Sequence, residues 1–242
     1  MTIETAPTAT RQAWLDQGAL PLPVAPDGTK RPAVKAWKQF QDPANRPTPE
    51  ELGRLWRADS DGIGILCGAA SGGIEMLELE GAAVKEGLLP QLQATFTERG
   101  QGALWQELMS GYMEITPSGG IHWYYRVQGE PLGNTKLASR PTTPEERETH
   151  PGQKIRVLIE TRGEGGWSVV APSAGRSHPT GEAWMAVPGR TPADIITITT
   201  TERDTIHDLC RILDQPPTGE SPAPATPTHP LLSAARQNLP GY

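Results

Sequence analysis

The chain has 242 residues, which is enough to bury a full hydrophobic core within one domain. Its formal net charge of −6 argues against a protein that coats nucleic acid with a generally basic surface, although a local basic groove is compatible with that charge. The 26 glycines and 25 prolines predict that much of the chain lies in turns and connections.

Simple patterns exclude further classes of protein. The two cysteines, Cys67 and Cys210, are far apart in sequence and predict neither a disulfide framework nor a zinc site. The longest apolar run, at 63–70, is too short to span a bilayer, and the first residues lack a signal-peptide pattern. We therefore expect a cytoplasmic protein with no zinc and no membrane contact.

The first third of the chain is predicted to alternate short helices and strands. Capping residues and apolar spacing indicate helices at 10–18 and 48–57 and strands at 20–25, 62–68 and 74–79. The second helix has the stronger start, because Thr48 can cap it and Pro49 occupies its first position. Between them, the loop 27–40 interleaves basic and aromatic residues, which fits either nucleic-acid contact or a solvated loop with two buried aromatics.

The middle of the chain predicts two helices followed by two strands. Apolar residues at helical spacing indicate a helix over 81–98, interrupted by Pro90, and a short amphipathic helix over 103–109. Strands at 112–115 and 122–127 flank a tight turn. The polar, proline-rich segment 130–153 is interpreted as a long surface excursion.

The last part of the chain centres on a predicted β-hairpin. Its strands are the apolar runs that end at Glu160 and begin at Trp167, joined by a glycine-rich turn. Short strands at 184–187 and 195–198 and a helix at 201–214 follow. Residues 216–230 are rich in proline and predict a linker.

Acidic residues at two predicted strand ends suggest a metal site. Glu78 and Glu80 are two residues apart on one strand, so both carboxylates point to the same face, whereas Glu75 does not share that face. With Glu160 as a third carboxylate, they form an oxygen-rich site suited to Mg²⁺ or Mn²⁺. The alternative is a solvent-facing edge strand with two glutamates of no special role.

Phosphate-binding chemistry is suggested by two other segments. Ser118, Gly119 and Gly120 resemble a phosphate cradle, since glycine lets backbone N–H groups approach oxygen atoms, and His122 could hold a phosphate or complete a metal shell. Arg162 is available for a bidentate phosphate contact. An ordinary turn, a half-buried histidine and an ordinary hairpin are the alternatives.

The order of these motifs resembles that of the bifunctional primase-polymerase (prim-pol) domain, a member of the archaeo-eukaryotic primase superfamily that is common in phages and mobile elements. E-L-E matches the first family motif, P-S-G-G-x-H the second, and the strand ending in I-E the third. The segment from Lys30 to Trp37 and the stretch G-N-T-K-L-A at 133–138 are also similar to the family. The family usually places aspartates in motifs one and three. This chain has glutamates there, whose longer side chains can reach a metal from a backbone set about one methylene further back.

The resemblance implies an α/β (α+β) core of the archaeo-eukaryotic primase type, with a mixed sheet, an RRM-like half and flanking helices. It implies a prim-pol catalytic domain over 1–214, followed by a proline-rich linker or tail over 215–242. In a two-metal mechanism Glu78, Glu80 and Glu160 would be catalytic and hold Mg²⁺ or Mn²⁺. The triphosphate would be bound by the remaining site residues, Ser118, Gly119, Gly120, His122, Lys136 and Arg162.

The implied function is template-directed nucleotidyl transfer that makes primers on single-stranded DNA from nucleoside triphosphates, with a helicase domain or protein as a further partner beyond the linker. Two alternatives stay open. One is a metal-dependent nuclease that uses the same carboxylates. The other is a catalytically silent module that binds nucleotide or DNA for a replicative helicase.

Overall fold

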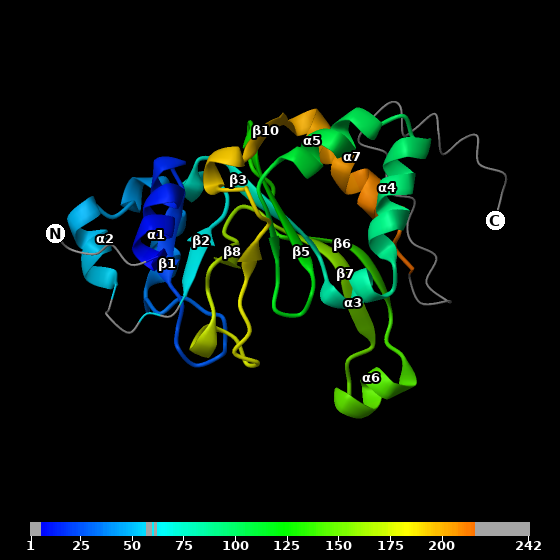
Figure 1. The fold of residues 1–242 in the computed structure, drawn as a ribbon, viewed down its shortest axis with the longest axis horizontal. Helices are drawn as coiled ribbons and strands as arrows, with labels where there is room; N and C mark the ends of the chain where they lie inside the picture. Colours follow the sequence, from blue (N-terminus) through cyan, green and yellow to red (C-terminus); the bar gives the residue numbers. More distant parts are fainter. Residues whose placement is uncertain (1–5, 57–59, 61, 216–242) are drawn as a thin grey trace.

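Two β-sheets and a layer of helices are stacked in the structure, a computed structural model that describes residues 6–56, 60 and 62–215 (Figure 1). Within these residues, the larger sheet has the strand order β6-β7-β3-β5-β4-β9, with β10 also paired to β5, and the smaller sheet has the order β1-β2-β8. The strands are β1 Leu20–Pro23, β2 Ile63–Leu66, β3 Ile74–Leu79, β4 Met113–Ile115, β5 Ile121–Gln128, β6 Thr135–Pro141, β7 Ile155–Arg162, β8 Trp167–Val170, β9 Met185–Ala186 and β10 Ile196–Thr199.

The helices lie on both outer sides of these sheets. They are α1 Ala6–Asp16, α2 Pro49–Leu55, α3 Gly81–Lys85, α4 Leu88–Glu98, α5 Gly102–Ser110, α6 Pro144–Thr149 and α7 Thr200–Arg211. Several of the connections contain short 3₁₀ helices, which are η1 Trp37–Gln41, η2 Pro43–Asn45, η3 Ala69–Ser71, η4 Gly175–Ser177 and η5 Pro192–Asp194. The strand pairs are antiparallel except for the parallel pair β5–β10, so the predicted mixed α/β fold is confirmed.

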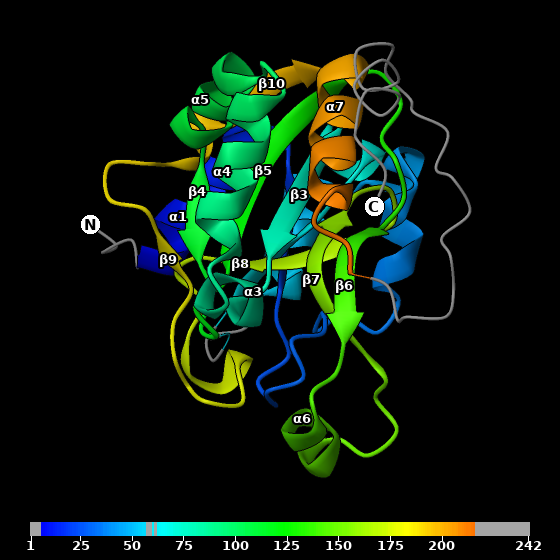
Figure 2. The ribbon, with the colours of Figure 1, turned by 90° about the vertical axis from the view of Figure 1, so that its right-hand side faces the viewer.

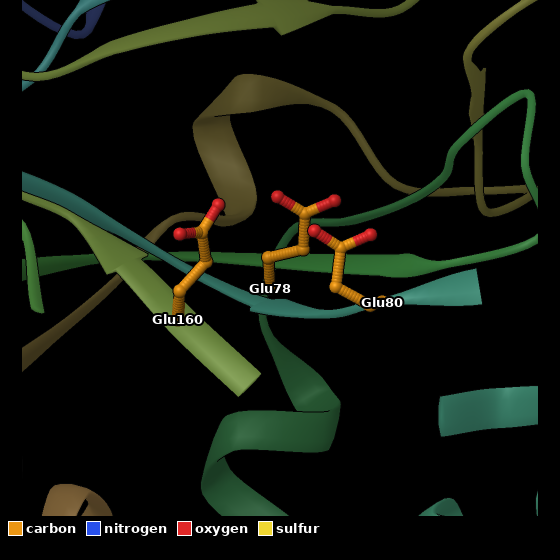
Figure 3. A group of neighbouring side chains, drawn as sticks. All are labelled: Glu78, Glu80 and Glu160. Atoms are coloured by element: carbon orange, nitrogen blue, oxygen red, sulfur yellow. The ribbon is translucent and has the colours of Figure 1, made fainter. Parts of the chain in front are cut away.

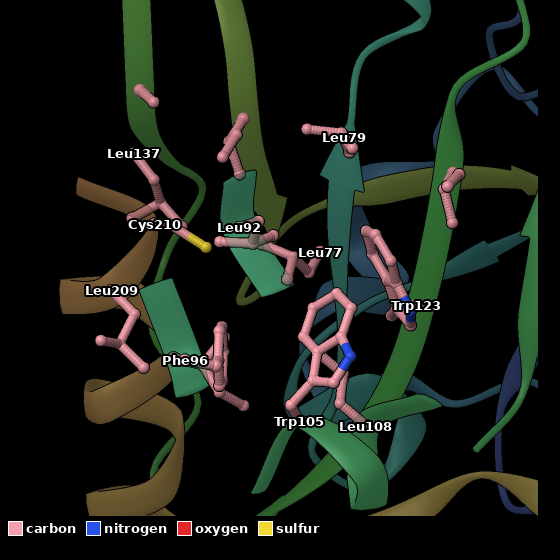
Figure 4. Packing of buried hydrophobic residues seen from close by; sticks show 14 of the residues in the cluster. Leu77, Leu79, Leu92, Phe96, Trp105, Leu108, Trp123, Leu137, Leu209 and Cys210 are labelled. Carbon is pink, nitrogen blue, oxygen red and sulfur yellow. The ribbon is translucent and has the colours of Figure 1, made fainter. Parts of the chain in front are cut away.

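The main core lies between the larger sheet and helices α4, α5 and α7, which cover one face of it (Figures 2 and 4). Leu77 and Leu79 point from β3 into this core, where Phe96 and Trp105 pack in a tilted aromatic pair with ring centres 5.2 Å apart. Fully burying each such side chain stabilises the fold by about 1.5–3 kcal/mol. Because side chains alternate along a strand, the even-numbered residues of β3 project from the opposite face of the larger sheet.

A second core lies between that opposite face and the smaller sheet. Met76 of β3 and Tyr124 of β5 pack there with Ile65 of β2 and with Trp14 of α1. Trp14 meets Tyr124 edge-on, with ring centres 5.3 Å apart. The larger sheet is thus covered on both faces, and the polar end of β3 projects into the space between the two sheets.

The predicted helix over 81–98 is divided, but not at Pro90. Helix α3 ends at Lys85 and α4 begins at Leu88, with Gly87 between them at φ 79°, a left-handed conformation that glycine adopts without strain. Pro90 lies in the first turn of α4, where its missing N–H would have had no helical partner.

The predicted surface excursion at 130–153 was wrong. It contains β6, whose Leu137 and Ala138 are buried in the main core, and α6, which projects beyond the sheet (Figures 1 and 2). Helix α6 begins with a Thr143 capping box and Pro144, the same start as Thr48 and Pro49 give to α2. The start signal was therefore present in the sequence.

The predicted hairpin between the runs at Glu160 and Trp167 was also wrong. Strand β7 pairs with β3 on one edge and β6 on the other, so it has no free edge for β8. The chain instead crosses through residues 163–166 to the smaller sheet, where β8 pairs with β2.

The C-terminal helix was predicted over 201–214, whereas α7 begins at Thr200 and ends at Arg211. Thr199 caps it through a capping box with Glu202, and Cys210 is buried in the core whereas Ile212 is 40% exposed. None of the helices in the described part of the chain has the length and hydropathy that a membrane crossing requires. The predicted linker lies, from residue 216 onward, outside the described residues.

Candidate active site

A single row of charged side chains crosses the larger sheet. Glu160 of β7 lies opposite Glu78 of β3, Glu78 lies opposite His122 of β5, and His122 lies opposite Glu114 of β4. Lys136 of β6 continues the row beside Glu160. Residues directly opposite one another in an antiparallel sheet project to the same face, so strand pairing alone gathers this set.

The three predicted acidic residues lie close together at this row (Figure 3). One carboxylate oxygen from each of Glu78, Glu80 and Glu160 lies within 4.8 Å of the others. Glu75 points the other way, as predicted, and its buried carboxylate accepts a hydrogen bond from the backbone N–H of Leu132 at 2.8 Å.

The three carboxylates carry more negative charge than their protein partners neutralise. Burial and the neighbouring carboxylates of Glu78 and Glu160 raise the pKa of Glu80 to about 7. Burial also raises the pKa of Glu160, while Arg162, which forms an ion pair with it, opposes the rise. A cluster of oxygen ligands of this kind fits a hard divalent cation, which would supply the missing positive charge.

His122 lies between two carboxylates and is buried. Its Nε2 is 3.4 Å from Glu78 Oε1, and its Nδ1 is 3.6 Å from Glu114 Oε2. Burial alone would lower the pKa of His122, but Glu78 and Glu114 raise it to about 9. The imidazolium lowers the pKa of Glu78 in turn, against the effect of burial. With a proton on both nitrogens, His122 carries a positive charge beside the carboxylates and is suited to bind an anion.

Glu114 was missed by the sequence analysis. Its side chain is fully buried behind His122, where it accepts hydrogen bonds from the Tyr112 hydroxyl at 2.7 Å and from the backbone N–H of Ala171 at 2.8 Å. These bonds fix the carboxylate that keeps His122 charged. Strand alternation could have placed Glu114 on the face of His122, but only with the pairing register in hand.

The Ser-Gly-Gly turn joins β4 to β5 at the edge of the acidic cluster. Gly119 donates its N–H to the Thr116 carbonyl at 2.8 Å, and Gly120 donates its N–H to the Thr116 hydroxyl at 2.9 Å. These two amides are engaged within the turn, so the predicted backbone cradle is not open at those positions. The Ser118 hydroxyl, 3.0 Å from that of Thr116, lines the cavity instead.

A cavity of about 430 Å³ brings the site residues together between the two sheets. The predicted residues that line it are Glu78, Glu80, Ser118, His122, Glu160 and Arg162. Lys136 does not line it, since its side chain is exposed beside Glu160. The opposite wall includes residues that the sequence analysis did not assign to the site, among them Lys30, Trp37, Trp167 and Trp184.

Comparison with known proteins identifies the family. The model of the Prim-Pol family, described as bifunctional DNA primase/polymerase, N-terminal, matches residues 11–197. The match covers more than half of the chain, so the chain belongs to this family, and the resemblance carried by the three motifs is confirmed. No curated protein matches the chain significantly.

Family membership sets the broad chemistry of the site. It implies nucleotidyl transfer of the primase-polymerase type, with DNA and nucleotides as the substrates and with a requirement for metal. The carboxylate cluster could bind that metal, and its donor set fits the requirement.

Proposed function

We propose that this protein is a DNA primase/polymerase that synthesises primers on single-stranded DNA by template-directed nucleotidyl transfer. The observation that carries the proposal is the group of side chains on one face of the larger sheet, where three clustered carboxylates lie beside a buried, positively charged histidine and an arginine. This group pairs a site for cations with a site for phosphate, and nucleotidyl transfer from a triphosphate needs both.

In this proposal Glu78, Glu80 and Glu160 hold Mg²⁺ or Mn²⁺. A bound divalent ion would supply charge neutralisation at the α-phosphate and pyrophosphate and a lower pKa for the attacking 3′-hydroxyl. Glu78 has a second role, because it keeps His122 protonated from one side while Glu114 does so from the other.

The cations that the larger sheet places in the cavity, His122 and Arg162, position the triphosphate. His122 donates from a fixed ring, and Arg162 is held by its ion pair with Glu160 at the edge of the cavity. Charge-assisted hydrogen bonds of this type hold the nucleotide in line for attack, which converts binding into a rate advantage. Ser118 contributes a hydroxyl, and Lys136 adds a positive charge outside the cavity.

The same proposal assigns residues 1–214 to the catalytic domain and residues 215–242 to a linker or tail. It also includes a helicase domain or protein as a partner beyond that linker.

A primer-synthesis assay tests the function. The protein is incubated with single-stranded DNA and labelled nucleotides, with Mg²⁺, with Mn²⁺ or with EDTA. We expect dinucleotides and longer products with Mn²⁺ or Mg²⁺ and none with EDTA. Degradation of the template without a new strand would identify a nuclease, and nucleotide binding without product under either metal would identify a silent binding module.

A further inference from the structure

Lys30 is the cation on the wall of the cavity opposite the carboxylates. Among the described residues that line the cavity, the other cations, His122 and Arg162, already contact carboxylates, whereas Lys30 forms no ion pair. Lys30 lines the same cavity as the clustered carboxylates of Glu78, Glu80 and Glu160. Lys30 therefore brings a positive charge that is not paired with a carboxylate of the described residues.

The backbone of Lys30 has an unusual conformation. Its φ is 62°, and among the described residues it is the one non-glycine residue with positive φ. A side chain makes this left-handed conformation costly, and such strain persists where the surrounding structure holds it. A glycine would occupy the position without strain, so the conformation is maintained at a cost for a residue that carries an ammonium group.

Trp167 and Trp184 hold Lys30 in place. The Trp167 indole N–H donates to the Lys30 carbonyl at 2.7 Å, and the Lys30 ammonium lies 5.8 Å from the centre of the Trp184 ring. Trp167 belongs to β8, and its ring lies against Gly64 of the neighbouring strand β2 and near Trp37. The smaller sheet thus fixes the backbone of Lys30 through Trp167, while Trp184, which directly precedes β9, faces the ammonium group.

We propose that the Lys30 ammonium binds the triphosphate of the incoming nucleotide and that Trp167 is its positioning residue. The inference rests on the proposed function, because it requires a triphosphate in the cavity. With Lys30 on one wall and His122 and Arg162 on the other, the phosphates would be bound from both sheets. A phosphate of the DNA strand offers the same chemistry, and the experiment separates the two sources.

Nucleotide binding by Lys30 variants provides the test. Lys30→Gln and Lys30→Gly are titrated with dATP, with inorganic tripolyphosphate and with single-stranded DNA, in the presence of Mg²⁺. We expect both variants to bind dATP and tripolyphosphate roughly tenfold or more weakly, the loss of one charge-assisted contact, and to bind DNA within about twofold of the unmodified protein. Lys38→Gln is the matched control, because Lys38 is exposed in the 3₁₀ helix Trp37–Gln41 and does not line the cavity. Its affinity for dATP should be unchanged.

Thermal melting separates the role in binding from a role in folding. Lys30→Gly should melt at a higher temperature than the unmodified protein, since glycine relieves the left-handed strain, while it binds dATP more weakly. A lower melting temperature together with weaker binding would mean that Lys30 serves the fold, which would overturn the proposal.

Trp167→Phe tests the positioning role, because it keeps an aromatic ring and removes the N–H donor. We expect a higher KM for dATP with little change in kcat, and we expect its effect to be smaller when Lys30 is already glutamine. Fully additive effects would show that Trp167 does not act through Lys30.

Failure of the inference is distinguishable from failure of the proposed function. If the unmodified protein makes primers and Lys30→Gln binds dATP equally well, the proposal for Lys30 is wrong and the function stands. Weaker DNA binding with unchanged dATP binding would assign Lys30 to the strand and would also overturn the proposal. If the unmodified protein binds no nucleotide and makes no product, both are wrong.

Discussion

At the scale of single residues, the cavity holds acids that repel one another and a histidine that two of the surrounding acids keep charged. Glu80 has no cationic partner within hydrogen-bond distance among the described residues, and its pKa of about 7 reflects burial beside two other carboxylates. Glu78 and Glu114 instead share His122. We therefore expect the carboxylates around Glu80 to bind a cation and His122 to bind an anion.

Divalent metal should raise the thermal stability of the protein. At about 100 times its dissociation constant, an ion that binds only the folded state adds about 2.7 kcal/mol, which corresponds to a rise of several degrees in a chain of this size. The double change Glu78→Gln and Glu80→Gln should abolish the rise, measured by differential scanning calorimetry with and without Mg²⁺ or Mn²⁺. A matched double change of exposed helical residues, Glu98→Gln and Glu107→Gln, should leave it intact. An unchanged response in the first variant would place the ions elsewhere.

Removal of the charged histidine should weaken nucleotide binding selectively. His122→Ala removes one charge-assisted contact, so dATP affinity should fall by about 1.5–3 kcal/mol while binding of single-stranded DNA stays nearly intact. Glu114→Gln should produce a smaller loss in the same direction, because it removes one of the two charges that keep His122 protonated. Equal losses for both ligands, or loss of the circular dichroism spectrum, would make His122 a structural residue.

At the scale of elements, α7 carries a buried neutral histidine at its contact with β5. His207 Nε2 lies 3.2 Å from the Tyr125 hydroxyl. Burial, together with the charges of Arg211 and Arg203, lowers the pKa of His207 to about 3. The unfolded chain, with a histidine pKa near 6.5, binds this proton more readily than the folded chain does. The contribution of neutral His207 to stability is therefore fully present above about pH 6.5 and is lost as the pH falls from there toward 3.

Acidification should destabilise the protein less when this histidine is replaced. Between pH 7.5 and 5, His207 should account for a loss of about 2 kcal/mol in the free energy of unfolding, which His207→Gln should not show. The comparison uses urea denaturation of both proteins at the two pH values, so that other titrating groups cancel. Equal losses in both proteins would mean that His207 is accessible to protons in the folded state.

The sequence predicted many of the elements because their signals are local. The capped start of α2, the alternation of β3 and the helical spacing of α5 and α7 all depend on neighbouring residues. Strand β6 and the partner of β8 were missed because both depend on which strands pair, and pairing is decided by contacts between distant segments.

The same distinction applies to the site. The motifs allowed Glu78, Glu80 and Glu160 to be predicted as one cluster, since alternation fixes their face and the resemblance links the two strands. The place of Glu114 beside His122 could not be predicted, because it needs the register of β4 against β5. The loop that holds Lys30 was considered for nucleic-acid contact, but its place in this cavity needs the smaller sheet to fold over the larger one. The engagement of the Gly119 and Gly120 amides by Thr116 was likewise invisible in the sequence.

At the scale of the whole molecule, each of the two sheets supplies different residues to the cavity. The larger sheet presents the carboxylates and His122, and the smaller sheet presents Trp167 and, through it, Lys30. Helices α4, α5 and α7 support the far face of the larger sheet and take no part in lining the cavity (Figure 2). The molecule is therefore a supported sheet that carries the acids, with a second sheet that closes the cavity from the other side.

We propose that the carboxylate cluster performs nucleotidyl transfer, and the extension of a labelled primer by Glu160→Gln is the decisive measurement. The variant keeps the size of the side chain and should keep the fold by circular dichroism. We predict that its rate with Mn²⁺ falls at least about 100-fold, because even the loss of a residue that only supports a metal ligand typically costs 10–100-fold. Glu86→Gln, an exposed glutamate that does not line the cavity, should keep the full rate. A folded Glu160→Gln protein that extends primers at the rate of the unmodified protein would show that the carboxylate cluster does not perform the reaction.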